Sequence, residues 1–290
     1  MKKAIPIFCC LLMLLCSVPL LCTAADAPVT SQEPRLTNIL LIGRDNRQEE
    51  PARSDCMILC SFSPDTGDVI FTSFLRDLYV PIPGHQNNRL NAAYALGGIS
   101  LLQDTLEHNF GIAVDGCIEV DFTSFPGIID ALGGVALTLR QDEADAINRE
   151  IPGRLCEGDH LLTGEQALAY SRIRNLDPDG DFSRSLRQRK LLTALLERYR
   201  NADLLTILSA LSDTLPLITT SFSRRDILRL GIRLWPLMEA PKITSQCFPT
   251  DGTYEYETIR GMNVLTADLE KLRIQFLQTL EDITKSIEKT

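Results

Sequence analysis

The chain has 290 residues, of which 44% are hydrophobic and 23% charged, and its 29 basic and 38 acidic side chains give a formal charge of −9. This composition is typical of a globular protein and excludes a disordered chain, a collagen and a polytopic membrane protein. An acidic chain also lacks the basic surface that neutralises phosphates, which excludes general nucleic-acid binding.

The first 25 residues predict export. Lys2 and Lys3 precede a run at 4–22 that is apolar apart from Ser17 and the cysteines, and Thr23-Ala-Ala25 offers small residues for signal peptidase. The run fits either a cleaved signal peptide or an uncleaved membrane anchor, and both interpretations stay open. In either case we expect the rest of the protein at the extracytoplasmic face of the bacterial cell membrane, anchored or secreted.

Strands and helices alternate along the rest of the chain. A linker is expected at 26–35, one domain at 36–202, and a helical C-terminal extension packed on the same domain at 203–290. The apolar patterns predict strands at 38–43, 56–62, 69–74, 117–122 and 135–139, and helices at 90–110, 122–132, 163–169, 183–200 and beyond 202. Short strands and turns are expected at 247–266. The second and third strands are expected to form a hairpin, and residues 170–174 an extended segment. This alternation predicts an α/β fold around one sheet.

Charged residues gather at the ends of these elements. The side chains that share this position are Asp45, Arg47, Arg53, Asp55, Arg76, Asp77, Arg172, Arg174, Arg184, Arg187 and Gln188. Arg172 and Arg174 are two apart, which places them on one face if the segment is extended. Neighbouring arginines need an anionic partner, and Asp45 with Asp55 can bind a hard cation such as Mg²⁺. Together they predict a pyrophosphate site, although codon usage or surface ion pairs also explain single arginines.

Seven motifs then follow one another between about Asn38 and Arg200. They are Leu41-Ile-Gly43-Arg-Asp45-Asn-Arg47, Arg53-Ser-Asp55, Ser73-Phe-Leu-Arg76-Asp77, Asn91-Ala-Ala-Tyr94, Asp130-Ala-Leu-Gly-Gly134-Val, Leu162-Thr-Gly164-Glu-Gln-Ala-Leu-Ala-Tyr170-Ser-Arg172-Ile-Arg174 and Asp181-Phe-Ser-Arg184-Ser-Leu-Arg187-Gln188. In this order and spacing, the chain resembles the LytR-CpsA-Psr family. Leu75, Ser183 and the Arg89-Leu-Asn91 stretch depart from the family's usual residues without removing a charge, and Arg44 adds one.

The resemblance implies a three-layer α-β-α sandwich whose central sheet is mixed and largely antiparallel, with an apolar tunnel for a lipid. It implies an Mg²⁺-dependent (or Mn²⁺-dependent) phosphotransferase that moves a glycopolymer, such as teichoic acid or capsule, from a polyprenyl-pyrophosphate carrier to peptidoglycan. On this chain, Asp45 and Asp55 match the metal-associated aspartates. Arg53, Arg76, Arg172, Arg174 and Arg184 match pyrophosphate-binding arginines, with Gln188 as a nearby polar contact.

The resulting hypothesis is a glycopolymer–peptidoglycan ligase. Asp45, Asp77 and Arg76 are its expected catalytic residues, and Arg187 joins the arginines expected to bind pyrophosphate. Two alternatives stay open: a polyprenyl-pyrophosphate pyrophosphatase, for which water is the acceptor, and a non-catalytic envelope regulator that binds lipid-linked glycans.

Overall fold

The computed structural model describes residues 36–45, 53–63, 67–177, 180–199, 202, 204–223, 225–227 and 242–285. The side chains of Asp45 and Arg53 are not described, although their backbone is. The expected signal or anchor segment, the linker before residue 36 and Arg47 lie outside these ranges. Within the described ranges, no helix has both the length and the apolar character that crossing a bilayer requires.

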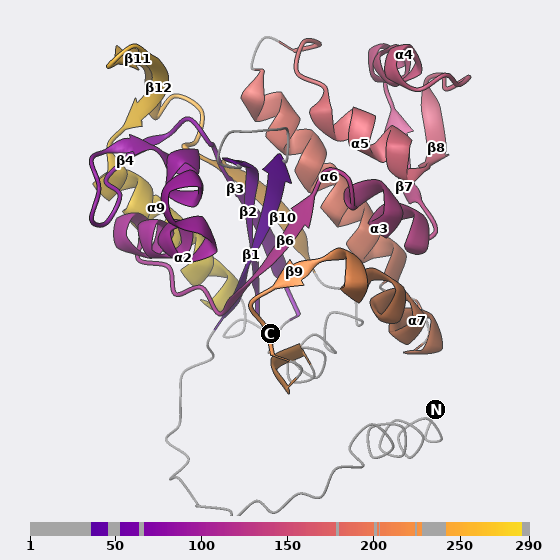
Figure 1. The fold of residues 1–290 in the computed structure, drawn as a ribbon, viewed down its shortest axis with the longest axis horizontal. Coiled ribbons are helices and arrows are strands. Elements are labelled where there is room, and N and C mark those ends of the chain that lie inside the picture. The colour runs from indigo at the N-terminus through magenta and orange to yellow at the C-terminus, as the bar shows by residue number, and fades with distance from the viewer. Residues whose placement is uncertain are drawn as a thin grey trace, which may run out of the picture. The chain divides into compact units, whose positions relative to one another are not determined.

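A six-stranded mixed sheet forms the centre of the fold (Figure 1). Its strands, in order across the sheet, are β10 (Ile243–Phe248), β3 (Val69–Phe74), β2 (Arg53–Phe62), β1 (Thr37–Asp45), β6 (Gly116–Asp121) and β9 (Thr219–Thr220). β1 pairs in parallel with β6, as β3 does with β10, and the other pairings are antiparallel. The expected hairpin is confirmed as β2 and β3, and the predicted α/β fold around a mixed sheet is confirmed as well.

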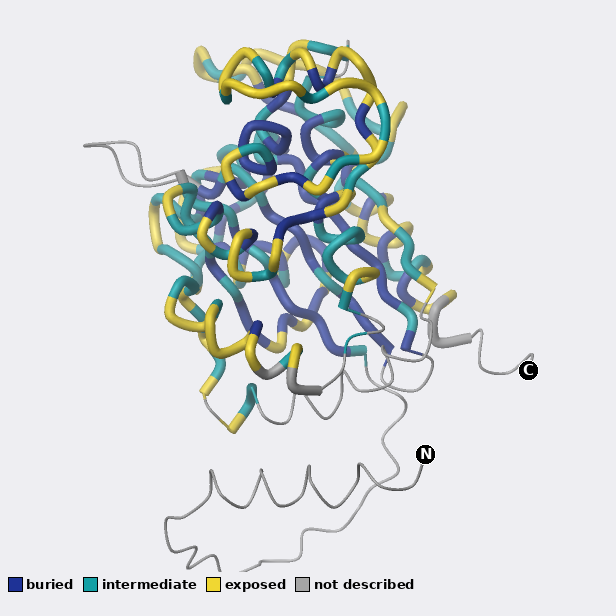
Figure 2. The backbone as a smooth tube through the Cα atoms, turned by 90° about the vertical axis from the view of Figure 1, so that its right-hand side faces the viewer, coloured by how far each residue is buried: buried dark blue, intermediate teal, exposed yellow. Residues whose placement is uncertain are grey.

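Both faces of the sheet are apolar, because hydrophobic residues occupy successive positions of the strands. Met57 and Leu59 of β2 belong to one hydrophobic cluster, whereas Ile58 and Phe62 belong to another on the opposite face. Side chains alternate between the faces of a strand, so such a strand must be covered on both sides. Figure 2 accordingly shows buried strands inside a partly exposed shell, which confirms the three-layer arrangement.

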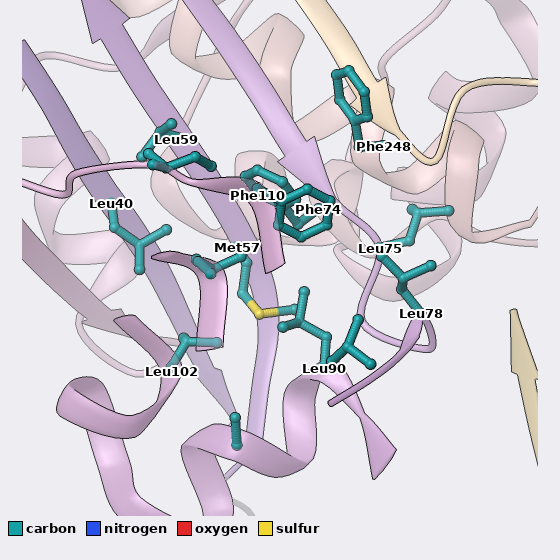
Figure 3. Packing of buried hydrophobic residues seen from close by; sticks show 14 of the residues in the cluster. Leu40, Met57, Leu59, Phe74, Leu75, Leu78, Leu90, Leu102, Phe110 and Phe248 are labelled. Carbon is teal, nitrogen blue, oxygen red and sulfur yellow. The ribbon is translucent and has the colours of Figure 1, made fainter. Parts of the chain in front are cut away.

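The larger cluster lies between the sheet and two helices, α2 (Leu90–Phe110) and α9 (Leu269–Lys285) (Figure 3). Phe74 packs against Phe110 of α2 with 4.9 Å between ring centroids, and against Phe276 of α9 at 5.9 Å. α2 departs from helical geometry at Gly97 and Gly98, where the sequence predicts a break. The first part of α2 begins directly after the short hairpin of β4 (Tyr79–Val80) and β5 (Asn88–Arg89).

On the other face, α6 (Asp181–Tyr199) covers the sheet through Leu192 and Leu196. A further cluster joins α6 to a group of shorter elements. These are α3 (Phe125–Ala131), β7 (Val135–Leu139), α4 (Gln141–Glu150), β8 (Gly158–Leu162) and α5 (Gly164–Arg172). β7 and β8 form an antiparallel hairpin of their own. This group positions α5, whose last residue, Arg172, faces the site described below.

The C-terminal segment contains more strand than the helical extension expected at 203–290. It begins with α7 (Leu204–Thr214) and a 3₁₀ helix, η1 (Leu215–Leu217). β9 and β10 then take the two outer positions of the central sheet, and β11 (Tyr254–Ile259) and β12 (Met262–Ala267) form a separate hairpin. The hairpin agrees with the short strands predicted at 247–266, whereas β9 and most of β10 pair with strands so distant in sequence that no local pattern predicts them.

One close approach in the α3–α5 contact is open to a stability test. A Cβ at Gly164 would lie 2.0 Å from the carbonyl oxygen of Pro126. We expect Gly164→Ala to lower the free energy of unfolding by ~2–3 kcal/mol, because the helices must move apart. Urea denaturation followed by circular dichroism measures this change.

Gly127→Ala is the matched control on α3. Its Cβ would lie 3.5 Å from Leu217, an ordinary contact. Replacing a helical glycine there removes backbone entropy from the unfolded chain, so the free energy of unfolding should rise or stay within about 1 kcal/mol. Equal destabilisation by the two substitutions would contradict the close packing of α3 on α5.

Candidate active site

The site lies at one end of the central sheet, where several strands bring charged residues together. β1 and β3 both run antiparallel to β2, so their C-terminal ends meet the N-terminal end of β2. The backbone of Asp45 pairs with that of Arg53. Arg76 and Asp77 follow β3, and Asp55 lies near the start of β2. The sheet thereby brings three separate motifs of the sequence to one edge.

Arg76 connects three carboxylates at this edge. Its Nη1 donates to Asp55 Oδ1 over 2.9 Å, and its Nε donates to Asp181 Oδ2 over 3.1 Å. Asp77 Oδ2 lies 3.5 Å from the same Nε. Burial alone would lower the pKa of Arg76, but the charges of Asp55 and Asp181 outweigh burial and raise it. Arg76 therefore stays protonated and holds the three carboxylates in place.

Asp181 is the first residue of α6 and forms ion pairs with two further arginines. Its Oδ1 lies 3.6 Å from Arg174 Nε and 3.4 Å from Arg184 Nη2. Arg184 also donates to the backbone carbonyl of Asp55 over 3.3 Å, and Arg174 Nη2 lies 4.0 Å from Asp55 Oδ2. Arg184 is buried, whereas the Arg174 side chain is 41% exposed. Arg174 is thus the member of this group that an incoming anion reaches most easily.

These arginines face a cavity of about 240 Å³. It is lined by Asp55, Phe122, Ser171, Arg172, Arg174, Arg184 and Gln188. The Arg172 guanidinium lies over the Phe122 ring, 4.5 Å from the centroid. The Nε atoms of Arg172 and Arg184 are buried and have no hydrogen-bond partner among the described residues. Three arginines that line one cavity favour an anion that accepts several hydrogen bonds at once.

One predicted detail of this wall is wrong. The sequence predicts an extended segment at 170–174 that points Arg172 and Arg174 to one face, but Arg172 is still helical as the last residue of α5. The chain turns at Ile173, which adopts non-helical angles of φ −59° and ψ 125°. Arg172 and Arg174 reach the same cavity because the chain turns between them.

The structure places Arg187 elsewhere. This side chain is buried between α4 and α6, where its Nε donates to Glu143 Oε1 over 2.9 Å. It also donates to Asp177 and to the carbonyl of Ile173. Arg187 is absent from the residues that line the cavity, whereas Gln188, the next residue, is present. Its contacts with Ile173 and Asp177 lie on either side of Arg174 in the chain, so Arg187 holds the segment that carries Arg174 in place.

Asp77 combines burial with neighbouring charges of both signs. Burial raises the pKa of Asp77, and the nearby carboxylate of Asp181 adds to this against the opposing charges of Arg76 and Arg89. Arg89 donates to Asp77 Oδ1 over 3.2 Å. A carboxylate whose pKa lies above its usual value is a suitable proton acceptor near neutral pH.

Arg44, the additional charge in the first motif, has partners on the neighbouring strand β6. Its Nε lies 3.5 Å from the buried Glu119, and its Nη2 lies 3.7 Å from Asp121. Tyr94 of α2 donates to Glu119 over 2.6 Å, and burial together with this bond raises its pKa to about 12. Arg44 therefore forms ion pairs beside β6, although its buried Nε has no hydrogen-bond partner among the described residues.

Asp181 is the member of the site that sequence reasoning missed. It lies in an acidic stretch that resembles a calcium loop without its essential glycine and glutamate, and a solvated turn is the simpler expectation there. Its spacing of three residues from Arg184 is the available signal, since such pairs meet on a helix. Its contact with Arg76, 105 residues away, has no local signature.

The carboxylates of the site suit a divalent cation only when a bound ligand supplies further oxygen atoms. Within the described part of the chain, no three His, Cys, Asp or Glu side chains form a cluster that could hold a metal ion. Arg76 occupies one oxygen of Asp55, and the other oxygen makes a long ion pair with Arg174 at 4.0 Å. Mg²⁺ is commonly held by one or two carboxylates plus phosphate oxygens of the substrate, and Asp55 fits that pattern.

Comparison with known proteins connects this geometry to a family. Residues 23–276 match the sequence profile of the LytR_cpsA_psr family. A "Polyisoprenyl-teichoic acid--peptidoglycan teichoic acid transferase TagT" from Bacillus subtilis is 32% identical over 226 residues, which cover 75% of this chain and 69% of the relative. The TagU protein of the same description from Bacillus mycoides is 35% identical over 173 residues, covering 59% of this chain and 55% of TagU. The chain thus spans little more than half the length of TagU.

Solved structures share the fold. A structure of TagT bound to LIIa-WTA is 27% identical, with a TM-score of 0.69, and the match covers 88% of this chain and 95% of that one. TagT with bound octaprenyl pyrophosphate lipid is 25% identical, with a TM-score of 0.65 over 88% of this chain and 95% of that one. The gbs0355 protein of Streptococcus agalactiae is 26% identical, with a TM-score of 0.71 over 85% and 88% of the two chains.

Arg187 can be distinguished from the arginines of the cavity by its effect on stability. We expect Arg187→Leu to lower the free energy of unfolding by ~3–5 kcal/mol, because it leaves Glu143 buried without its partner. Arg174→Leu removes only long, partly exposed ion pairs and should cost less than about 1 kcal/mol.

The measurement is chemical denaturation of both variants and of the double variant Arg187→Leu, Glu143→Leu. The second substitution removes the unpaired charge, so it should recover much of the loss. Similar stabilities of the Arg187 and Arg174 variants would show that Arg187 is not a structural residue.

Proposed function

The chain belongs to the LytR-CpsA-Psr family, and on that premise we propose that it transfers a glycopolymer from a polyprenyl-pyrophosphate carrier to peptidoglycan. The product is a phosphodiester between the polymer and the acceptor. The observation that carries the proposal is the convergence of Arg172, Arg174 and Arg184 on one cavity beside Asp55. The names of TagT and TagU and the octaprenyl pyrophosphate held by TagT support the same chemistry.

The arginines suit the charge changes of this reaction. The acceptor hydroxyl attacks the phosphorus that carries the glycan, the bond to the bridging oxygen breaks, and polyprenyl phosphate leaves with that oxygen. Negative charge spreads over the phosphoryl oxygens and the leaving phosphate as the bonds exchange. Guanidinium groups already in place stabilise that charge without reorganising. Arg172, Arg174 and Arg184 hold the donor in this scheme, and Gln188 adds a polar contact.

Arg53 belongs to the same proposed donor site because its backbone lies opposite Asp45 at the end of β2. Arg76 has a double role in this proposal. It supports catalysis directly from the edge of the cavity, and it holds Asp55 and Asp181 in position.

We propose Asp77 as the group that receives the acceptor's proton. It follows β3 at the same end of the sheet, and its pKa is raised. The proton leaves the acceptor oxygen as that oxygen bonds to phosphorus, and it passes to the Asp77 carboxylate.

We propose Asp55 and Asp45 as the protein's ligands for Mg²⁺ or Mn²⁺. When bound, the cation neutralises charge on the phosphate oxygens. Asp45 then has a second expected role, orienting the acceptor hydroxyl at the end of β1. In the transfer assay below, chelation of divalent cations should abolish product formation, and full activity after chelation would contradict this assignment.

We also propose that the protein works at the extracytoplasmic face of the membrane. The apolar segment at 4–22 and the lipid carrier of the proposed donor support this location. Labelling of an engineered surface cysteine in intact cells with a membrane-impermeant reagent tests it, and protection from the reagent would contradict it.

The decisive test of the donor site is Arg174→Ala. With a purified lipid-pyrophosphate-linked glycan and peptidoglycan, we expect transfer to fall by about 10²-fold or more, because one donor to the developing charge is lost. Mass spectrometry of the phosphodiester product measures the rate. Arg154→Ala, an exposed arginine that does not line the cavity, is the matched control and should keep full activity.

Full transfer by the Arg174 variant would contradict this donor site. The same assay without peptidoglycan distinguishes transfer to peptidoglycan from the pyrophosphatase alternative. Release of phosphorylated glycan at an undiminished rate in the absence of the acceptor would indicate that water is the natural acceptor.

The role of Asp77 predicts a pH dependence. A proton acceptor works only when ionised, so transfer should rise with pH through the pKa of Asp77, which lies above the usual value near 3.9. Asp77→Asn should lower the rate by ~10²–10⁴-fold and remove this acidic limb. Asp104→Asn, an exposed carboxylate on α2, should leave the pH–rate profile unchanged. An unchanged acidic limb in the Asp77 variant would assign the proton acceptor to another group.

A further inference from the structure

The β11–β12 hairpin stands beside the proposed active site and has no part in the donor chemistry. It lies at the same end of the sheet as the start of α6 (Figure 1). Two contacts fix it there. The backbone N–H of Leu265 donates to the carbonyl of Asp77 over 2.8 Å, and Tyr254 stacks on Phe182 with 4.9 Å between ring centroids. The first contact is with the backbone of Asp77, and the second is with the residue that follows Asp181. Both of these carboxylates lie beside Arg76.

A row of three aromatic rings leads outward from the site along this hairpin. Phe182 follows Asp181 on α6, Tyr254 stacks on Phe182, and Tyr256 meets Tyr254 edge-on at 5.5 Å. Tyr254 and Tyr256 are two apart on β11 and share one face. Tyr256 is 72% exposed, the largest value among the exposed large hydrophobic side chains of the described residues. Tyr256 is the one aromatic residue in that exposed group of described side chains, and it lies at the outer end of a row that begins at the proposed active site.

A cavity of about 520 Å³ adjoins the row between the hairpin and the start of α9. This volume is within the range of small-molecule sites. Its walls carry hydroxyl, amide and charged groups, among them Thr253, Thr266, Gln275 and Lys271, with the Tyr254 ring at one side. Aromatic faces beside hydrogen-bonding groups suit a sugar, whose C–H groups pack on a ring while its hydroxyls reach polar side chains.

The charge of the hairpin distinguishes between the two glycans of the proposed reaction. Together with the turn before it and the start of α9, which adjoin the cavity, the hairpin lies in a segment, 251–271, that contains five acidic and two basic side chains. Glu255 and Glu257 are both exposed on β11. A polyanionic polymer is repelled by such a surface, whereas an uncharged glycan strand is not. The donor's phosphates have their partners in the arginine cavity, on another wall of the site.

We propose that the β11–β12 hairpin and its adjoining cavity bind the uncharged glycan strand of the acceptor, with Tyr256 and Tyr254 as stacking surfaces. This inference rests on the proposed transfer to peptidoglycan and names its acceptor subsite. The row of rings directs the bound strand toward Asp77 and the cavity that holds the pyrophosphate. Tyr256 acts in binding and touches no reacting atom.

The test is a binding measurement without donor. The probe is an uncharged oligomer of β-1,4-linked N-acetylglucosamine, titrated by NMR against the full chain in detergent, because peptidoglycan strands without their peptides carry a free lactyl carboxylate on every second sugar. We expect binding by the unmodified chain and by Tyr256→Phe, which keeps the ring. Tyr256→Ala should weaken binding about 3–10-fold, the loss of one aromatic contact. Leu161→Ala on β8, 59% exposed and remote from the hairpin in Figure 1, should bind like the unmodified chain.

Kinetics provide the second measurement. In the transfer assay, Tyr256→Ala should raise KM for the glycan acceptor by the same factor and leave KM for the lipid-linked donor unchanged. Equal binding by Tyr256→Ala and the unmodified chain would overturn the proposal, as would no binding by the unmodified chain. Tyr256-dependent binding of poly(ribitol phosphate) would overturn it too, because the subsite would then belong to an anionic polymer.

These outcomes are separate from those of the proposed function. Glycan binding is measured without donor, so its failure leaves transfer from the lipid carrier standing. A chain that binds the glycan probe through Tyr256 but transfers nothing to peptidoglycan would contradict the proposed function and leave the sugar subsite in place.

Discussion

The ion pairs around Arg76 are the constraint on which the site depends. One guanidinium reaches Asp55 at the start of β2 and Asp181 at the start of α6, and it lies beside Asp77 after β3. Three carboxylates so close together would repel one another without it. The arginine therefore makes it possible for three acidic groups to stand together beside the cavity that Arg172, Arg174 and Arg184 line.

The chain uses arginine in two ways that composition alone does not separate. Arg172, Arg174 and Arg184 face the cavity, where their donors are available to a ligand. Arg187 and Arg189 are buried in the protein. Arg189 donates to the hydroxyls of two serines, and burial lowers its pKa. The chain has 22 arginines and seven lysines. The planar, strongly basic guanidinium suits both environments, so part of this preference has a structural source.

The sequence predicts the first two-thirds of the fold well, because local patterns specify it. The run 38–43 and the hairpin after it appear as β1, β2 and β3, and the Gly97-Gly98 break appears in α2. Two kinds of feature escape such reasoning. β10 pairs with β3 across more than 170 residues, and Asp181 gains its role from Arg76 on a different strand. Arg172 and Arg187 show a third limit, since spacing predicts a shared face only when the backbone conformation is known.

The pairing of β10 with β3 has a consequence for how the protein is made. Val69 finds its partner Ile243 only after most of the chain has been synthesised, and Phe248 lies beside Phe74 at the edge of the site. Until then one side of β3 is an open strand edge, and the larger hydrophobic cluster lacks the side chains of α9. Pairing over such distances is slow. The end of β3 that leads to Arg76 and Asp77 is therefore completed only by residues 243–248, which are synthesised late.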